Sequence, residues 1–175
     1  MTGHNTDDFA DRLHLVWGQG FLSPGGPAEV AEIVKDLDLA DASVLDIGCG
    51  AGGPAIVLRR DFGARLVCID VEAPLLDRAA RLALDAGVAD GVEFRLVDPG
   101  PLPFEDATFD VVFSKDALIQ IPEKSALFAE ILRVLKPGGT FAASDWLCAN
   151  DAANDVEFQR FLERSHLDFA MATAS

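Results

Sequence analysis

Hydrophobic positions fall into two alternating patterns from Ala42 onward. Short runs rich in β-branched and aromatic residues alternate with longer stretches whose apolar residues recur three or four positions apart. This alternation is typical of βαβ units, in which buried strands are joined by amphipathic helices. The apolar runs predict five strands, at residues 43–47, 65–70, 92–97, 109–114 and 140–145. The pattern therefore predicts an α/β fold built on a parallel sheet.

The stretches around these strands predict helices. In one of them Leu75, Ala79 and Leu82 share a face, and Gly87 marks its end. The predicted helices cover residues 27–39, 54–62, 75–86, 124–135 and 155–169. There is no internal repeat or linker. We expect residues 1–41 to form an N-terminal arm and a first helix, with residues 9–26 as a lid, and residues 42–175 to form one core.

Composition narrows the class of function. Half of the 175 residues are hydrophobic and a quarter are charged, as in globular proteins. The formal net charge of −15 repels nucleic-acid backbones and anionic lipid surfaces. Three widely spaced cysteines favour reduced thiols in a cytoplasm over disulfides or a zinc site. With no apolar run of membrane-spanning length, we expect a cytoplasmic protein without a nucleic-acid, membrane or metal partner.

A glycine-rich turn follows the first predicted strand. Gly48, Gly50 and Gly53 spell G-x-G-x-x-G, a turn whose backbone can approach a ligand, and Asp70 is placed to bind a ribose diol. A nicotinamide dinucleotide and S-adenosylmethionine would both use these features. Asp46 favours S-adenosylmethionine, because a carboxylate attracts its ammonium and sulfonium and repels a pyrophosphate. Asp46 could also simply order the turn through hydrogen bonds to backbone N–H groups.

Asp98 follows the third predicted strand. A carboxylate there can accept a hydrogen bond from the exocyclic amine of adenine. The sequence Asp-Pro-Gly-Pro is equally ordinary turn chemistry, so both interpretations stay open. The run LKPGGT before the fifth strand reads as a helix end and a tight turn.

Four segments together resemble the class I S-adenosylmethionine-dependent methyltransferases. They are VLDIGCGAGG, CIDV, VDPGPLPFEDATFDVVFSKDAL and RVLKPGGTF, which span most of residues 43–145. More narrowly, WGQGFLSPGG and SKDALIQIPEK followed by SDW resemble the phosphoethanolamine and related small-amine N-methyltransferases, with glycine/sarcosine-type enzymes nearby. The resemblance implies a Rossmann-like sheet of order 3-2-1-4-5 with helices on both faces and S-adenosyl-L-methionine as cofactor. The implied cofactor contacts are Leu22, Ser23, Asp46, Gly48, Cys49, Gly50, Asp70, Val71, Asp98, Pro99 and Lys115.

The methyl acceptor is expected at the carboxyl ends of the first and fourth strands, where the connections diverge. Asp116 can bind an ammonium or take its proton, and Gln120 can hydrogen-bond a polar substituent. Alternatively, Asp116 is a solvated or helix-capping carboxylate. Trp17 and Phe21 can cover the cofactor or pack in the core, and His14 is expected to be a structural or surface residue. The resemblance implies methyl transfer to a small molecule, and Asp116 and Gln120 would suit an amine as the acceptor.

Two departures from the resembled family bear on these expectations. The chain has no tyrosine and carries Gln120 where a histidine is expected around the amine, which argues against the usual phosphobase substrate. The chain also ends before the antiparallel hairpin that usually completes the sheet. A fragment, a naturally short enzyme and a non-catalytic cofactor-binding domain therefore remain alternatives, as does a nicotinamide-dependent oxidoreductase. The open edge of the last strand predicts either a homodimer or shielding by the helix at 155–169.

Overall fold

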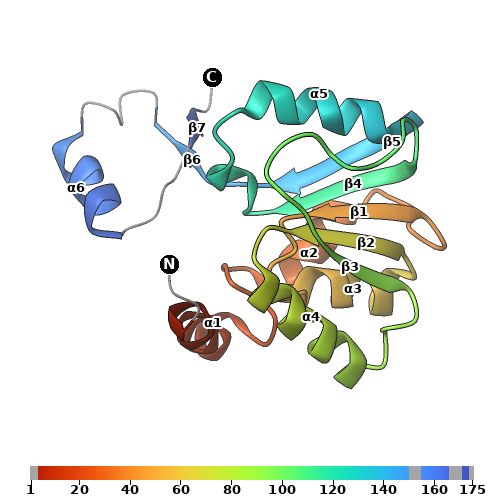
Figure 1. The fold of residues 1–175 in the computed structure, drawn as a ribbon, viewed down its shortest axis with the longest axis horizontal. Coiled ribbons are helices and arrows are strands. Elements are labelled where there is room, and N and C mark those ends of the chain that lie inside the picture. The colour runs from red at the N-terminus through yellow and green to blue at the C-terminus, as the bar shows by residue number, and fades with distance from the viewer. Residues whose placement is uncertain (1–3, 150–154, 166–170, 174–175) are drawn as a thin grey trace.

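A five-stranded parallel sheet forms the centre of the computed structural model, which describes residues 4–149, 155–165 and 171–173 (Figure 1). The strand order is β3-β2-β1-β4-β5, which confirms the predicted order. The strands are β1 (Ser43–Ile47), β2 (Arg65–Asp70), β3 (Val92–Leu96), β4 (Phe109–Lys115) and β5 (Leu135–Ser144). The strands predicted from apolar runs therefore all exist, and β1 and β2 have the predicted bounds.

The fifth strand begins five residues earlier than predicted. Leu135 pairs with Phe109, and the next regular pair joins Thr140 to Val111. The residues between Leu135 and Thr140 bulge out of the ladder, and Gly138 adopts a positive φ of 83°. The LKPGGT run is thus a bulged start of β5 and not only a helix end and a turn.

Helices cover both faces of the sheet, as predicted (Figure 1). On one face, α2 (Gly26–Val34), α3 (Gly53–Phe62) and α4 (Ala73–Asp85) bury Val30, Leu58 and Leu76 in a shared apolar cluster. On the other, α5 (Lys124–Val134) buries Ile131 in a second cluster. The helix α2 ends five residues before the predicted boundary, because the chain turns after Val34 while Leu39 still reaches the core.

Several elements were not predicted. An N-terminal helix, α1 (His4–Trp17), precedes the core, and a short 3-10 helix, η1 (Leu118–Gln120), follows β4. After β5, the strands β6 (Leu147–Cys148) and β7 (Ala172–Thr173) pair in parallel, so no antiparallel strand borders β5 within the ranges described above. The predicted last helix corresponds to α6 (Val156–Ser165), and its residues 166–169 lie outside the described ranges.

No helix among the described residues is both long and apolar enough to cross a membrane.

Candidate functional site

The glycine turn after β1 has a backbone that only glycine adopts easily. Gly48 and Gly50 have φ angles of +73° and +51°. A Cβ on Gly48 would collide with the side chain of Ala117, and one on Gly50 would lie 2.9 Å from Leu22 Cδ1. Ala117, just after β4, and Leu22 of the N-terminal segment (residues 18–26) therefore lie close against the turn. The N–H of Cys49 donates to Ile69 O at 3.1 Å and its side chain is buried.

Asp70 connects the end of β2 to this turn. Its Oδ2 accepts the backbone N–H of Gly50 at 2.8 Å, and its Oδ1 accepts that of Glu72 at 3.0 Å. Each carboxylate oxygen keeps a further lone pair, and the residue is half-buried. The two bonds orient the Asp70 carboxylate beside the glycine turn, where it can still accept hydrogen bonds from a diol.

Asp46 lies deeper, in β1, with a side chain that is almost completely buried. Its Oδ2 has no hydrogen-bond partner among the residues described. Burial and the negative charge of Asp70 together raise the pKa of Asp46 to about 8. A buried, unpartnered carboxylate beside a second carboxylate fits a cationic ligand and disfavours an anionic one. The ammonium and sulfonium of S-adenosylmethionine meet this requirement, whereas the pyrophosphate of a dinucleotide does not.

Exposed groups continue from Asp70 along the ends of β2 and β3. Val71 is 52% exposed and Leu96 is 55% exposed, which gives two apolar surfaces beside polar backbone. Asp98 and Pro99 follow β3 and are also exposed. An apolar surface with a nearby carboxylate matches a flat adenine ring that carries an amine. The predicted contacts at Val71, Asp98 and Pro99 are thus exposed just beyond the carboxyl ends of the parallel strands β2 and β3.

The N-terminal segment is fixed over the glycine turn. Gly20 O accepts the N–H of Gly53 at 3.0 Å, and Phe21 is buried in the core cluster beneath α2 and α3. Phe21 therefore packs in the core, one of the two alternatives for this residue. Leu22 lies against Gly50, and Ser23 lies next along the segment.

Lys115, at the end of β4, holds this segment. Its Nζ lies 2.9 Å from Ser23 Oγ and 2.7 Å from Pro24 O, and its side chain is 2% exposed. Glu29 of α2 pairs with the same Nζ at 2.7 Å. An ammonium group has three protons, so these contacts occupy much of its donor capacity. Lys115, predicted as a cofactor contact, thus serves as an anchor for the segment, and Glu29 was not identified from the sequence.

Asp116 follows Lys115 in a left-handed conformation, with φ +54°. Its Oδ2 lies 2.6 Å from Lys115 Nζ, and its N–H donates to Ser144 O at 2.9 Å. Such a conformation is uncommon for a residue other than glycine and is sustained by surrounding contacts. The structure thus holds Asp116 rigidly at the carboxyl end of β4. Gln120 lies in η1 and is exposed.

A further carboxylate at this edge was not predicted. Asp145 directly follows β5, next to Ser144, the register partner of Lys115. Burial raises the pKa of Asp145, and the charge of Asp116 adds to this effect. The segment SDW contained the residue, but its proximity to Asp116 depends on the pairing of β4 with β5. Asp46 is the next-to-last residue of β1, and Asp116 and Asp145 directly follow β4 and β5, so the three carboxylates lie near the carboxyl ends of three adjacent strands.

Two predicted structural or covering residues lie on α1. His14 Nδ1 lies 2.8 Å from an amino nitrogen of Arg78 in α4, and Arg78 also pairs with Asp11. These contacts attach α1 to the core. Trp17 is 37% exposed. Within the described part of the chain, no group of three or more His, Cys, Asp or Glu side chains is arranged to hold a metal ion.

Several known methyltransferases are similar to this chain. A family model described as "Methyltransferase domain" matches residues 45–143. The chain is 34% identical over 158 residues to phosphoethanolamine N-methyltransferase 1 of Arabidopsis thaliana, covering 90% of this chain and 32% of that protein. It is 31% identical over 166 residues to a sterol 24-C-methyltransferase of Gibberella zeae, covering 89% of this chain and 44% of that protein.

A solved structure is also similar. Phosphoethanolamine N-methyltransferase 2 of Haemonchus contortus, in complex with S-adenosyl-L-methionine, superimposes with a TM-score of 0.88 at 26% identity. The match covers 98% of this chain and 40% of that one. The chain thus spans about a third of the length of the phosphoethanolamine methyltransferases that it matches in sequence.

Proposed function

Because the chain belongs to the class I S-adenosylmethionine-dependent methyltransferases, with S-adenosylmethionine as cofactor, we propose that it transfers a methyl group to a small-molecule amine. The observation that carries the choice of an amine is the rigidly held carboxylate of Asp116 at the carboxyl end of β4. A carboxylate there can bind a protonated amine and can accept the proton that the amine must lose before it reacts.

The cofactor is assigned to the glycine turn and its surroundings. Asp70 would accept hydrogen bonds from the ribose diol, while Val71, Asp98 and Pro99 would contact the adenine. Asp46 would face the positive charges of the methionine part. The turn at Gly48, Cys49 and Gly50, together with Leu22 and Ser23, would lie against the ligand. Lys115 would hold the segment that carries Leu22 and Ser23 in place through its bonds to Ser23 and Pro24.

When bound, S-adenosylmethionine supplies an electrophilic methyl group on a sulfonium. The chain's own residues then have three tasks. Asp116 holds the amine and takes its proton at a carboxylate oxygen, and Lys115 and Ser144 keep that carboxylate in place. Gln120 would hydrogen-bond a polar substituent of the acceptor. The segment that carries Phe21 and Leu22 limits access of water to the glycine turn, so that positioning and desolvation supply most of the rate enhancement.

The negative charge around the proposed acceptor site, at the carboxyl ends of β4 and β5, favours a cationic acceptor without a phosphate group. Glu29 and Asp116 pair with the Lys115 ammonium at 2.7 and 2.6 Å, and Asp145 lies close enough to Asp116 for their charges to interact. A doubly anionic phosphobase would meet this negative charge without a free cation among these four residues to offset it. We therefore propose a small amine or amino acid as acceptor, in contrast to the phosphoethanolamine named for the relatives.

Turnover assays test the proposal. Methyl transfer would be measured against amines, phosphobases, thiols and sterols, with wild-type protein and with Asp116→Asn. Asparagine tolerates a left-handed conformation, so the variant should fold and bind S-adenosylhomocysteine with unchanged affinity. We expect amine turnover to fall by about 100-fold or more. Cofactor binding without methyl transfer to any acceptor would instead identify a binding domain, and preference for phosphobases would refute the amine assignment.

A further inference from the structure

The connection between β3 and β4 runs over the face of the sheet that α5 covers (Figure 1). It begins with Asp98 and Pro99, the proposed adenine contacts. Just upstream, the N–H of Val97 donates to Asp70 O at 3.0 Å. This bond ties the residue just before Asp98 to the end of β2. The other end of the exposed segment needs a second point of attachment if Asp98 is to have a defined position.

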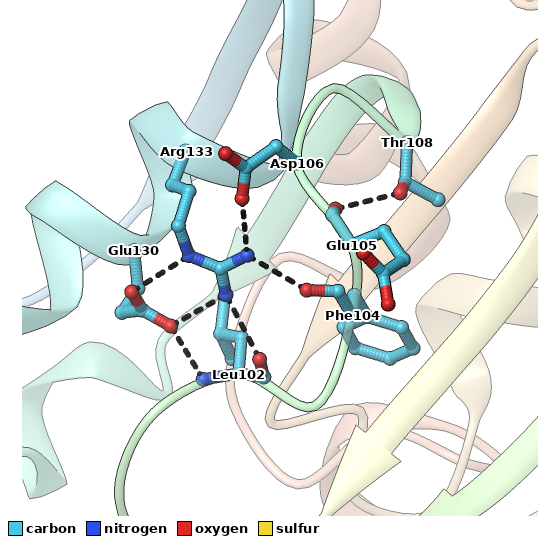
Figure 2. Close-up of polar contacts among 7 residues, drawn as sticks. All are labelled: Leu102, Phe104, Glu105, Asp106, Thr108, Glu130 and Arg133. Atoms are coloured by element: carbon cyan, nitrogen blue, oxygen red, sulfur yellow. Dashed lines mark hydrogen bonds and ion pairs between the residues drawn. The ribbon is translucent and has the colours of Figure 1, made fainter.

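Two side chains of α5 provide that attachment. Arg133 donates to the backbone oxygens of Leu102 and Phe104 at 2.9 and 2.7 Å, as Figure 2 shows. It also donates to Asp106 Oδ1 at 2.9 Å. Glu130 accepts Arg133 Nε–H at 2.9 Å on one oxygen, and its other oxygen lies 2.7 Å from the guanidinium. All five guanidinium N–H donors thus have acceptors.

Leu102 is the residue that this pair holds most completely. Its oxygen accepts from Arg133, and its N–H donates to Glu130 Oε2 at 2.8 Å. Its side chain is 7% exposed and packs in the apolar cluster beneath α5. The bonds from Arg133 also lower the pKa of Glu130 to about 2, so the pair stays charged at any ordinary pH. Leu102 is therefore a fixed point throughout the working range.

Only a short exposed stretch separates this fixed point from Asp98. It contains Pro99 and Pro101, whose rings restrict φ, on either side of Gly100. With Val97 tied to β2 and Leu102 tied to α5, the direction of this stretch is determined at both ends. Loosening the attachment of Leu102 would let Asp98 occupy a range of positions.

We infer that Arg133 and Glu130 are positioning residues for the cofactor: by fixing Leu102 they set where the Asp98 carboxylate meets the adenine amine. The inference rests on the proposed contact between Asp98 and adenine. If the pair of Arg133 and Glu130 had a purely structural role, it would stabilise the fold and leave discrimination between ligands unchanged. Discrimination at the adenine amine is therefore the property that separates the two roles.

Matched ligands and variants provide the test. S-adenosylhomocysteine and S-inosylhomocysteine differ at the position of the adenine amine, and calorimetry gives the ratio of their dissociation constants. The variants are Arg133→Gln, Arg133→Lys, Glu130→Gln and Asp98→Ala. The control is Lys136→Met, which removes a similar ion pair with Asp110, at 2.8 Å, near the start of β5. Thermal unfolding reports the stability of each variant.

We expect Arg133→Gln to lower the preference for S-adenosylhomocysteine by about fivefold, the value of one net hydrogen bond. Arg133→Lys should not restore it, because an ammonium lacks the planar fork. Lys136→Met should lose stability and keep the wild-type preference. If Arg133→Gln does not fold, Glu130→Gln, which keeps the side-chain volume, decides the question in the same way.

Two results would overturn the inference. In the first, Asp98→Ala loses the preference for S-adenosylhomocysteine while the folded Arg133 and Glu130 variants keep it in full. This result would overturn the inference and leave the proposed role of Asp98 intact. An unchanged preference in Asp98→Ala would overturn the proposed role of Asp98, and the inference with it. Amide exchange at Leu102 gives an independent readout, since its N–H should exchange faster in the Glu130 variant.

Discussion

Asp46 and Asp70 lie on neighbouring strands, and burial together with the negative charge of Asp70 raises the pKa of Asp46 to about 8. Asp70 accepts two backbone N–H bonds, whereas Asp46 Oδ2 has no partner among the described residues. At neutral pH Asp46 therefore carries a proton until a cation approaches. A positively charged ligand that binds beside Asp46 would therefore favour release of that proton.

Binding of S-adenosylmethionine should release this proton. The cation favours ionised Asp46, so affinity should increase by up to about tenfold per pH unit below pH 8 and level off above it. Calorimetry in buffers of different ionisation enthalpy counts the protons released. Asp46→Asn should fold, bind more weakly and lose this pH dependence. The same pH dependence in that variant would show that another group titrates.

The stability of the cofactor-free domain should change with the same proton. The pKa of Asp46 rises from 3.8, its ordinary value, to about 8 in the folded state. Between these values the folded state binds more protons than the unfolded state, so this contribution to stability is complete below pH 4 and is lost as pH rises toward 8. Urea unfolding of wild type and Asp46→Asn from pH 5 to 8 measures it. The free energy of unfolding of Asp46→Asn minus that of wild type should increase with pH. A difference that does not change with pH would contradict the assignment.

Replacing Asp70 should weaken cofactor binding. Asp70→Ala removes the acceptor for the ribose diol and for the Gly50 N–H, and we expect a loss of about 1 to 3 kcal/mol in binding free energy. Asp70→Asn keeps one acceptor oxygen and should lose less. Titration with S-adenosylhomocysteine measures both, with circular dichroism to confirm folding. Unchanged affinity in the alanine variant would exclude the ribose assignment.

The central strands were predictable because β1 and β4 are almost entirely buried and mostly apolar. Val44 and Val112, for example, are fully buried, so their strands are apolar on both faces. The start of β5 was not predictable, because Pro137 and Gly138 are typical of a turn and the bulge depends on pairing with β4. The helix α1 was also missed, since it is acidic and leaves Leu15 89% exposed.

Candidate ligand contacts were predictable where a local motif carries them, as with Gly48 and Asp70. The contacts of Lys115 were not, because Glu29 and Pro24 lie more than 80 residues away in the sequence. Likewise, the approach of Asp145 to Asp116 arises from strand pairing. Residues that support a site through distant contacts leave no spacing pattern, and the structure is needed to find them.

Lys115→Met should destabilise the domain and release the N-terminal segment. The substitution leaves Glu29 and Asp116 without their shared cation, which we expect to cost about 3 kcal/mol or more. Hydrogen exchange over residues 18–26 should accelerate, and in wild type S-adenosylhomocysteine should slow it if this segment acts as a lid.

The control is Lys35→Met, which removes an exposed pair with Glu32 just after α2 and should cost less than about 1 kcal/mol. Equal exchange over residues 18–26 in the two variants would show that Lys115 does not hold the segment.

The outer edge of β5 is expected to associate with a second copy of the chain. β4 lies on one side of β5, and no strand lies on the other within the described residues. Figure 1 shows α6 beyond the end of the sheet and not along this edge. Ala143, Trp146 and Leu132 are exposed nearby. Free backbone groups beside apolar side chains favour pairing with another strand.

Sedimentation velocity over a range of protein concentrations tests this association. Ala143→Lys places a charge on the edge and should shift the protein toward monomer, because the charge would be desolvated in a paired edge. Leu84→Lys is the matched control, since Leu84 is 70% exposed on α4, which covers the sheet near β3. A wild-type protein that stays monomeric at all concentrations, or equal dissociation in both variants, would exclude β5 as the interface.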